Sequence, residues 1–168
     1  MRYHVVGKQP NSKMCFVCGL KNPSGLRAYF YELDNGELMA VFKAIEEHQS
    51  YPGLLHGGVA TAILDETIGR AILTKHDEPV WGVSVEFRIR YKKPIPLCKE
   101  LKVIGRITKN SGSLFEGTGE ILLPDGSVAA EGHGKYLKRP LEKIAEFDFD
   151  EEEWRVVSTP DDPAEVEL

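Results

Sequence analysis

The chain has 168 residues, of which 42% are hydrophobic, and a formal net charge of -5. This length and apolar content suffice for one domain with a hydrophobic core and give no reason to expect two. No apolar run approaches the roughly 20 residues that cross a bilayer, and the start, MRYHVVGKQPNSK, lacks an apolar secretion signal, so we expect a cytoplasmic protein that does not enter membranes.

Acidic residues are concentrated at the end of the chain. Residues 141–168 contain eleven acidic and two basic side chains, whereas residues 1–140 carry a net charge of +4. We therefore predict one domain over residues 1–140, with an N-terminal extension that contains Cys15 and Cys18, and a solvated acidic tail over residues 141–168 with a short helix near 144–154. The weakly basic body favours an anionic ligand and excludes a typical nucleic-acid-binding protein.

A hairpin and one long helix are predicted in the first half of the body. Residues 27–33 and 38–45 have the composition of strands and flank Asp34-Asn35-Gly36, a turn-forming sequence. The apolar-rich segment 57–75 contains no proline and predicts the only long helix of the body. Its apolar residues point in several directions, which favours a helix buried within a wrapping sheet.

The second half of the body has the period of β-strands. Apolar and polar residues alternate over residues 83–91, which predicts a half-buried strand, and three more strands are predicted at 101–108, 114–123 and 128–137. This order does not alternate strand and helix as parallel units do, so we predict an α+β fold, an antiparallel sheet with one helix packed on it. The open edges of such a sheet favour a homodimer or a larger assembly.

One face of the predicted helix combines small residues with a carboxylate. Helical spacing places four residues on this face: Gly58, Ala62, Asp65 and Gly69. A carboxylate on a mostly apolar helix either is functional or accepts hydrogen bonds from neighbouring structure, and both interpretations stay open for Asp65. The adjacent Glu66 has Arg70 four residues further on, which predicts an exposed ion pair and favours Asp65 as the functional group.

The start of the predicted helix, His56-Gly57-Gly58, is free of bulky side chains. The first backbone amides of a helix have no partner within it, and the helix dipole favours negative charge at this end. These amides are therefore candidates for binding an oxygen atom that becomes negative during a reaction.

The His-Gly-Gly sequence, the apolar helix with Asp65 and the strand GVSVEFRIRYKKP resemble the hotdog-fold thioesterase superfamily. The resemblance is particularly to its phenylacetic-acid-pathway and thioesterase-superfamily-member branches. It covers roughly residues 25–138, and the segment CFVCGLKNPSGL resembles an N-terminal extension of one subset of such proteins. The resemblance implies an antiparallel sheet wrapped around one long central helix, a homodimer or homotetramer, and active sites between subunits.

The resemblance also implies roles for individual residues. The Gly57 amide would polarise the thioester carbonyl, with His56 and Gly58 shaping the same corner. Asp65 would activate water or attack the carbonyl directly, and Ser84, from the partner subunit, would help to place the water.

The implied reaction is hydrolysis of an acyl-CoA or acyl-carrier thioester, with acyl-CoA as the ligand, no nucleic-acid or membrane partner, and no metal or cofactor. Two alternatives remain. One is a hydratase or dehydratase on the same fold, and the other is an acyl-CoA-binding protein without catalysis.

Cys15 and Cys18 form a Cys-x-x-Cys pair that invites a metal or redox interpretation. A closed zinc site needs four ligands, and neither a second such pair nor a His-x-x-x-His sequence follows. We therefore expect a packing role for these cysteines, with metal binding and a reactive dithiol as the alternatives.

Overall fold

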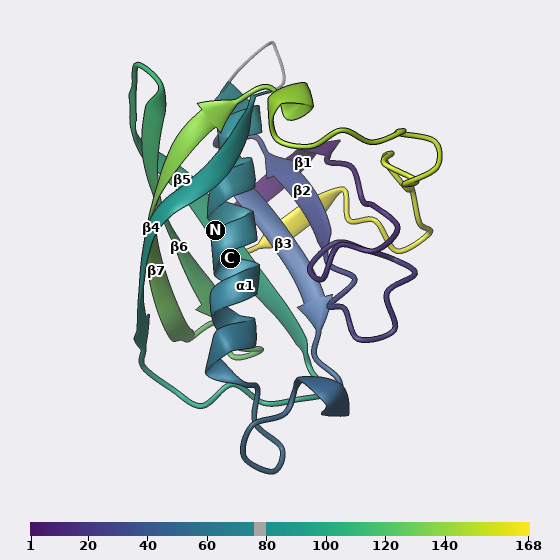
Figure 1. Cartoon of the computed structure of the whole chain (residues 1–168). Helices are drawn as coiled ribbons and strands as arrows, with labels where there is room; N and C mark the ends of the chain where they lie inside the picture. The colour runs from purple at the N-terminus through teal and green to yellow at the C-terminus, as the bar shows by residue number, and fades with distance from the viewer. Residues whose placement is uncertain (76–79) are drawn as a thin grey trace.

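The computed structural model describes residues 1–75 and 80–168, and its strands form one antiparallel sheet that curves around a central helix (Figure 1). The order across the sheet is β4-β7-β6-β5-β3-β2-β1-β8. The strands are β1 (Arg2–Lys8), β2 (Tyr29–Leu33), β3 (Leu38–Lys43), β4 (Trp81–Tyr91), β5 (Glu100–Ser111), β6 (Leu114–Leu122), β7 (Val128–Arg139) and β8 (Glu165–Glu167). The predicted α+β hotdog architecture is confirmed.

The helix α1 (Gly57–Arg70) packs against β4, β5, β6 and β7. Ile63, Leu64 and Ile68 are completely buried between the helix and the sheet. The prediction of a helical segment over residues 57–75 is confirmed, but its last part is the 3₁₀ helix η2 (Ala71–Lys75). Two further 3₁₀ helices are η1 (Glu46–His48) and η3 (Leu141–Lys143). Among the residues described, no helix is long and apolar enough to cross a membrane.

The predicted hairpin is formed by β2 and β3, which pair in antiparallel register. Its turn contains Gly36 at φ +77°, a conformation that glycine adopts without strain. Leu38 is fully buried and Phe30 lies under the N-terminal loop in the main core. The hairpin therefore joins the core that packs on α1, with β3 in contact with the helix.

Strand β4 lies at an open edge of the sheet and is interrupted by a β-bulge between Ser84 and Glu86. The bulge changes the alternation that the sequence predicted. Phe87 is partly buried and packs on the core, but Val83 and Val85 are exposed by 38% and 63%. A bulge inserts one extra residue, so the residues on its two sides no longer follow a single alternation between the faces of the sheet. The prediction of regular alternation over residues 83–91 was therefore wrong.

The acidic tail packs on the N-terminal segment, which Figure 1 shows on the same side of the molecule. Strand β8 pairs with β1, Arg155 pairs with Asn11, and the Trp154 ring lies 5.1 Å from that of Trp81. The predicted helix near 144–154 is not formed, since only turns follow η3 there. Most of the tail is exposed or half-buried, while Trp154, Asp162 and Val166 contact the body.

Candidate active site

Asp65 lies on the third turn of α1 with its carboxylate half-buried. The Ser84 hydroxyl lies 2.9 Å from both carboxylate oxygens, and the Tyr136 hydroxyl donates to Oδ1 at 3.0 Å. Tyr136 is only 1% exposed. The carboxylate is therefore fixed by two hydroxyl groups from the sheet and keeps one partly open side.

The register of β4 and β7 brings these two hydroxyls together, because Ser84 stands opposite Tyr136 across the ladder. The bulge after Ser84 keeps this serine on the helix side of the sheet. Gly69 leaves room for the tyrosine, since a Cβ there would lie 3.2 Å from the ring. The tyrosine ring stacks on Phe115, with ring centres 4.9 Å apart.

Sequence reasoning missed Tyr136. One signal was available in the strand sequence EGHGKYL, where alternation puts Tyr136 on the same face as Gly132 and Gly134. Two glycines before an aromatic residue on one face indicate that something packs closely there. The sequence does not reveal that the element packed there is the turn of α1 that carries Asp65.

Burial raises the pKa of Asp65, and the neighbouring charge of Glu66 adds to this effect, while the hydrogen bonds from Ser84 and Tyr136 oppose it. The pKa of Tyr136 is also raised, first by burial and then by the charge of Asp65. Tyr136 therefore remains a protonated donor at neutral pH. Asp65 is a carboxylate with more affinity for a proton than usual, which suits a catalytic base.

The His56-Gly57-Gly58 corner forms the N-terminus of α1. His56 is the N-cap, and its Nδ1 accepts a hydrogen bond of 2.9 Å from the Gly58 amide. The backbone amide of His56 donates to His48, which anchors the corner on η1. Within the described chain, the Gly57 amide has no hydrogen-bond acceptor and is available to a ligand.

Tyr91, at the end of β4, holds the first turn of α1 from the side. Its hydroxyl donates to the Gly57 carbonyl at 2.7 Å and lies 3.0 Å from the Thr61 hydroxyl. A pocket of about 390 Å³ opens beside Gly57 and is walled in part by Tyr91, Lys93 and Ile95. Sequence analysis did not single out Tyr91, whose role depends on where β4 ends.

The site residues fall into two groups on the same helix. Gly57 and Asp65 are eight residues apart, which at 1.5 Å per residue separates them by about 12 Å. Ser84 contacts Asp65 of its own chain, whereas the resemblance implied that the serine comes from the partner subunit. One chain therefore holds a carboxylate group and an amide group that cannot reach the same carbonyl.

The predicted ion pair between Glu66 and Arg70 is present, with Nε at 2.6 Å from Oε1. It is not exposed as predicted, because the Arg70 side chain is only 3% accessible and its guanidinium lies 4.5 Å from the centre of the Phe30 ring. The N-terminal segment covers it, which no local pattern indicates. Within the described residues, one group has the chemistry of metal ligands: Cys15, Cys18 and Glu66.

Comparison with known proteins identifies the family. The family model described as "Thioesterase superfamily" matches residues 52–130, which include α1 and β4. Human acyl-coenzyme A thioesterase 13 is 30% identical over 105 residues, which cover 61% of this chain and 74% of that protein.

Solved structures have the same fold. The thioesterase superfamily protein RHA08564 superimposes with a TM-score of 0.67 at 25% identity over 73% of this chain, which spans only 59% of RHA08564. The E. coli PaaI protein from the phenylacetic acid degradation operon gives a TM-score of 0.61 at 15% identity, over 68% of this chain and 81% of PaaI. The chain belongs to the thioesterase superfamily.

Proposed function

We propose that the protein hydrolyses acyl-CoA thioesters to a free acid and coenzyme A, with Asp65 as the catalytic carboxylate. The observation that carries the proposal is the half-buried Asp65 carboxylate, held by Ser84 and Tyr136 in a domain of the thioesterase superfamily. The human relative named acyl-coenzyme A thioesterase 13 supports acyl-CoA as the substrate class.

In this mechanism Asp65 either removes a proton from a water molecule that attacks the thioester carbon, or attacks that carbon itself and forms an anhydride that water opens. In both routes the carbon–sulfur bond breaks and the thiolate leaves with a proton from solvent. The raised pKa of Asp65 serves both routes, because a more basic carboxylate is also a stronger nucleophile. Neither route calls for a cofactor.

The Gly57 amide is the proposed donor to the carbonyl oxygen, which gains negative charge as water adds. His56 and Gly58 shape this corner through the N-cap hydrogen bond. Because Gly57 lies about 12 Å from Asp65 along α1, the amide must come from a second subunit. We therefore propose a homodimer, or a homotetramer built from such dimers, with each active site shared between two chains.

The open edge of β4 is the proposed dimer interface. Its exposed Val83 and Val85 lie on the strand that also carries Ser84. Pairing of this edge with its copy would satisfy the free backbone groups and bring a second α1 close to Asp65. Light scattering at micromolar concentration tests this proposal, and a monomeric mass would contradict it.

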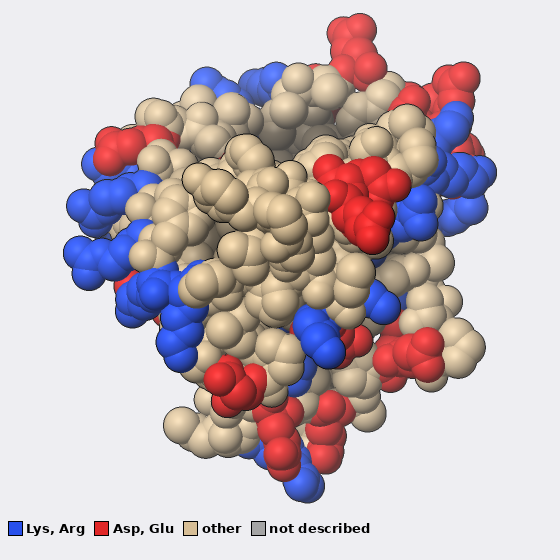
Figure 2. Space-filling model, turned by 90° about the horizontal axis from the view of Figure 1, so that it is seen from below, with Lys and Arg blue, Asp and Glu red and all other residues tan. Residues whose placement is uncertain are grey.

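The pocket beside Gly57 is the proposed entry for the coenzyme. Lys92 and Lys93 line it, and Figure 2, which views the end where α1 begins, shows Lys and Arg on both sides of a largely uncharged centre, with Asp and Glu among them. The cationic side chains of Lys92 and Lys93 suit the phosphates of coenzyme A. We propose residues 1–140 as the catalytic domain, on which residues 141–168 pack.

The test is thiol release from a panel of acyl-CoA substrates of different chain length and aromatic character. We expect turnover of at least one substrate and a loss of about 100- to 10,000-fold in Asp65→Asn, the range of a removed general base. Glu142→Gln, which removes an exposed carboxylate in η3, outside the site and the proposed interface, is the control and should remain active.

Absence of turnover above a boiled control for every substrate would refute the hydrolase. Saturable binding without thiol release would instead assign an acyl-CoA-binding protein, and water addition to an enoyl-CoA would assign the hydratase.

A further inference from the structure

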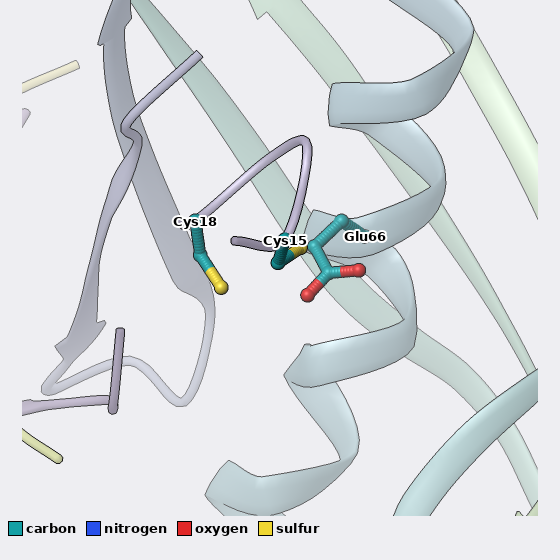
Figure 3. A group of neighbouring side chains, drawn as sticks. All are labelled: Cys15, Cys18 and Glu66. Carbon is teal, nitrogen blue, oxygen red and sulfur yellow. The ribbon is translucent and has the colours of Figure 1, made fainter. Parts of the chain in front are cut away.

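Three side chains with metal-ligand chemistry meet between the N-terminal loop and α1. The Cys15 sulfur, the Cys18 sulfur and a carboxylate oxygen of Glu66 all lie within 4.8 Å of one another. Figure 3 shows the two cysteines on the loop and the Glu66 carboxylate extending from the helix toward them. The fold thus assembles ligands that are far apart in the sequence.

We propose that Cys15, Cys18 and Glu66 bind a thiolate-preferring divalent metal ion, with Zn²⁺ as the expected occupant. Two cysteines and a carboxylate are ligand types that zinc accepts, and soft sulfur ligands select zinc over magnesium or calcium. A water molecule would complete a tetrahedral site. The site lies outside the proposed catalytic groups, and the proposal does not depend on the hydrolase activity.

The neighbouring polar groups leave one carboxylate oxygen of Glu66 available to a metal ion. Arg70 Nε binds Oε1 of Glu66, while in the described chain Oε2 has no hydrogen-bond partner. Arg70 Nη2 donates to the Cys18 sulfur at 3.2 Å, and the Ser12 hydroxyl lies 3.4 Å from the same sulfur. Such hydrogen bonds orient metal ligands from outside the coordination sphere.

The charges balance when the site is filled. Metal binding deprotonates both thiols, so the three ligands together carry three negative charges. A divalent ion and the buried guanidinium of Arg70 neutralise them completely. The ion pair with Glu66 already balances the buried Arg70 charge when the thiols are protonated, and the filled site keeps the total charge at zero.

A reversible disulfide is the rival use of a Cys-x-x-Cys pair. Reactive cysteines favour electropositive surroundings, and Arg70 next to Cys18 supplies a positive charge. Glu66 next to both sulfurs opposes a thiolate and supplies a third ligand to a cation, which a disulfide does not need. The position of Glu66 therefore favours the metal.

The test uses the full chain, stripped of metal with a chelator, kept reduced with a phosphine and titrated with Co²⁺ as a spectroscopic probe. We expect thiolate-to-cobalt charge-transfer absorption that saturates at one equivalent and is displaced by Zn²⁺. Cys15→Ser and Cys18→Ser should each lose most of this absorption, and Glu66→Gln should weaken Co²⁺ binding. Cys98→Ser removes an exposed cysteine outside the cluster and should match the wild type.

A second measurement needs no variant and is therefore insensitive to folding defects. In the wild type, added Zn²⁺ should slow alkylation of the partly exposed Cys15, identified by peptide mass, while the exposed Cys98 reacts at an unchanged rate. Alkylation that is unaffected by Zn²⁺, together with no charge-transfer band, would overturn the metal site. A Cys15–Cys18 disulfide that forms in oxidised protein, with no metal bound to the reduced protein, would establish the dithiol instead.

Discussion

Replacing Gly57 with proline removes the proposed oxyanion donor while leaving the helix intact. Gly57 is the first residue of α1, where proline is favoured because its missing N–H makes no helical hydrogen bond. The preceding His56 has φ -64° and ψ 134°, the extended conformation that proline requires of its neighbour. We expect Gly57→Pro to lower kcat by about 100- to 1,000-fold, or about 2.7–4 kcal/mol, the usual effect of losing one such donor.

The matched control is Gly57→Ala, which keeps the amide and adds one carbon. This Cβ would lie 3.1 Å from the Tyr91 hydroxyl, so a small adjustment of that side chain accommodates it. The assay is thiol release at saturating acyl-CoA, with thermal unfolding to show that both variants fold. If Gly57→Pro retained the same kcat as Gly57→Ala, the amide would not be the donor and the reasoning would be refuted.

Three further predictions concern pH and stability. Tyr136→Phe removes a hydrogen bond that lowers the pKa of Asp65, so the acid limb of kcat/KM should move to higher pH, and an unmoved limb would contradict this role. Because burial raises the pKa of Asp65, its ionised form weakens folding. The free energy of unfolding of Asp65→Asn should therefore be higher than that of the wild type near pH 8. The difference should fade as the pH falls and Asp65 becomes protonated. Urea titrations that give no difference at pH 8 would contradict this prediction. Although burial opposes it, hydrogen bonds from Lys8 and Tyr31, among others, hold the pKa of Asp162 far below its usual value. Asp162→Asn should therefore lose about 1–3 kcal/mol at neutral pH, a loss that disappears in acid, and equal stability at pH 7 would exclude this contribution.

Local patterns were sufficient to predict the central part of the fold. The helix and most strands of the body follow from periodicity, because each buries its own apolar face. Strands β1 and β8 were not predicted, since each is stabilised by pairing with distant residues rather than by its own pattern. Val166, 7% exposed in the three-residue β8, packs with Tyr31 and Leu33, a contact that sequence spacing does not reveal.

The site residues likewise fall into those that local patterns predict and those that depend on tertiary structure. Asp65 and the His56-Gly57-Gly58 corner were found because helical spacing and helix-terminus chemistry are local properties. The facing of Ser84 depends on a bulge, and the position of Tyr136 depends on the register of β4 and β7, so neither could be deduced from one strand alone.

The proposed role of the cysteine pair depended on the tertiary structure more than that of any other site residue. Spacing alone supplied two ligands, and the absence of a second Cys-x-x-Cys argued against a metal. The third candidate ligand, Glu66, comes from α1 and was assigned only to its ion pair with Arg70. A side chain can serve both partners, since a carboxylate has two oxygens.

The most direct test of the shared active site is complementation between two inactive chains. Asp65→Asn and Gly57→Pro subunits carrying different tags are co-expressed, and the mixed dimer is purified through both tags. One of its two sites then combines an intact Asp65 with an intact Gly57 amide from the other chain, so about half of the wild-type activity should return. A mixed dimer as inactive as its two parents would contradict an active site built from both subunits.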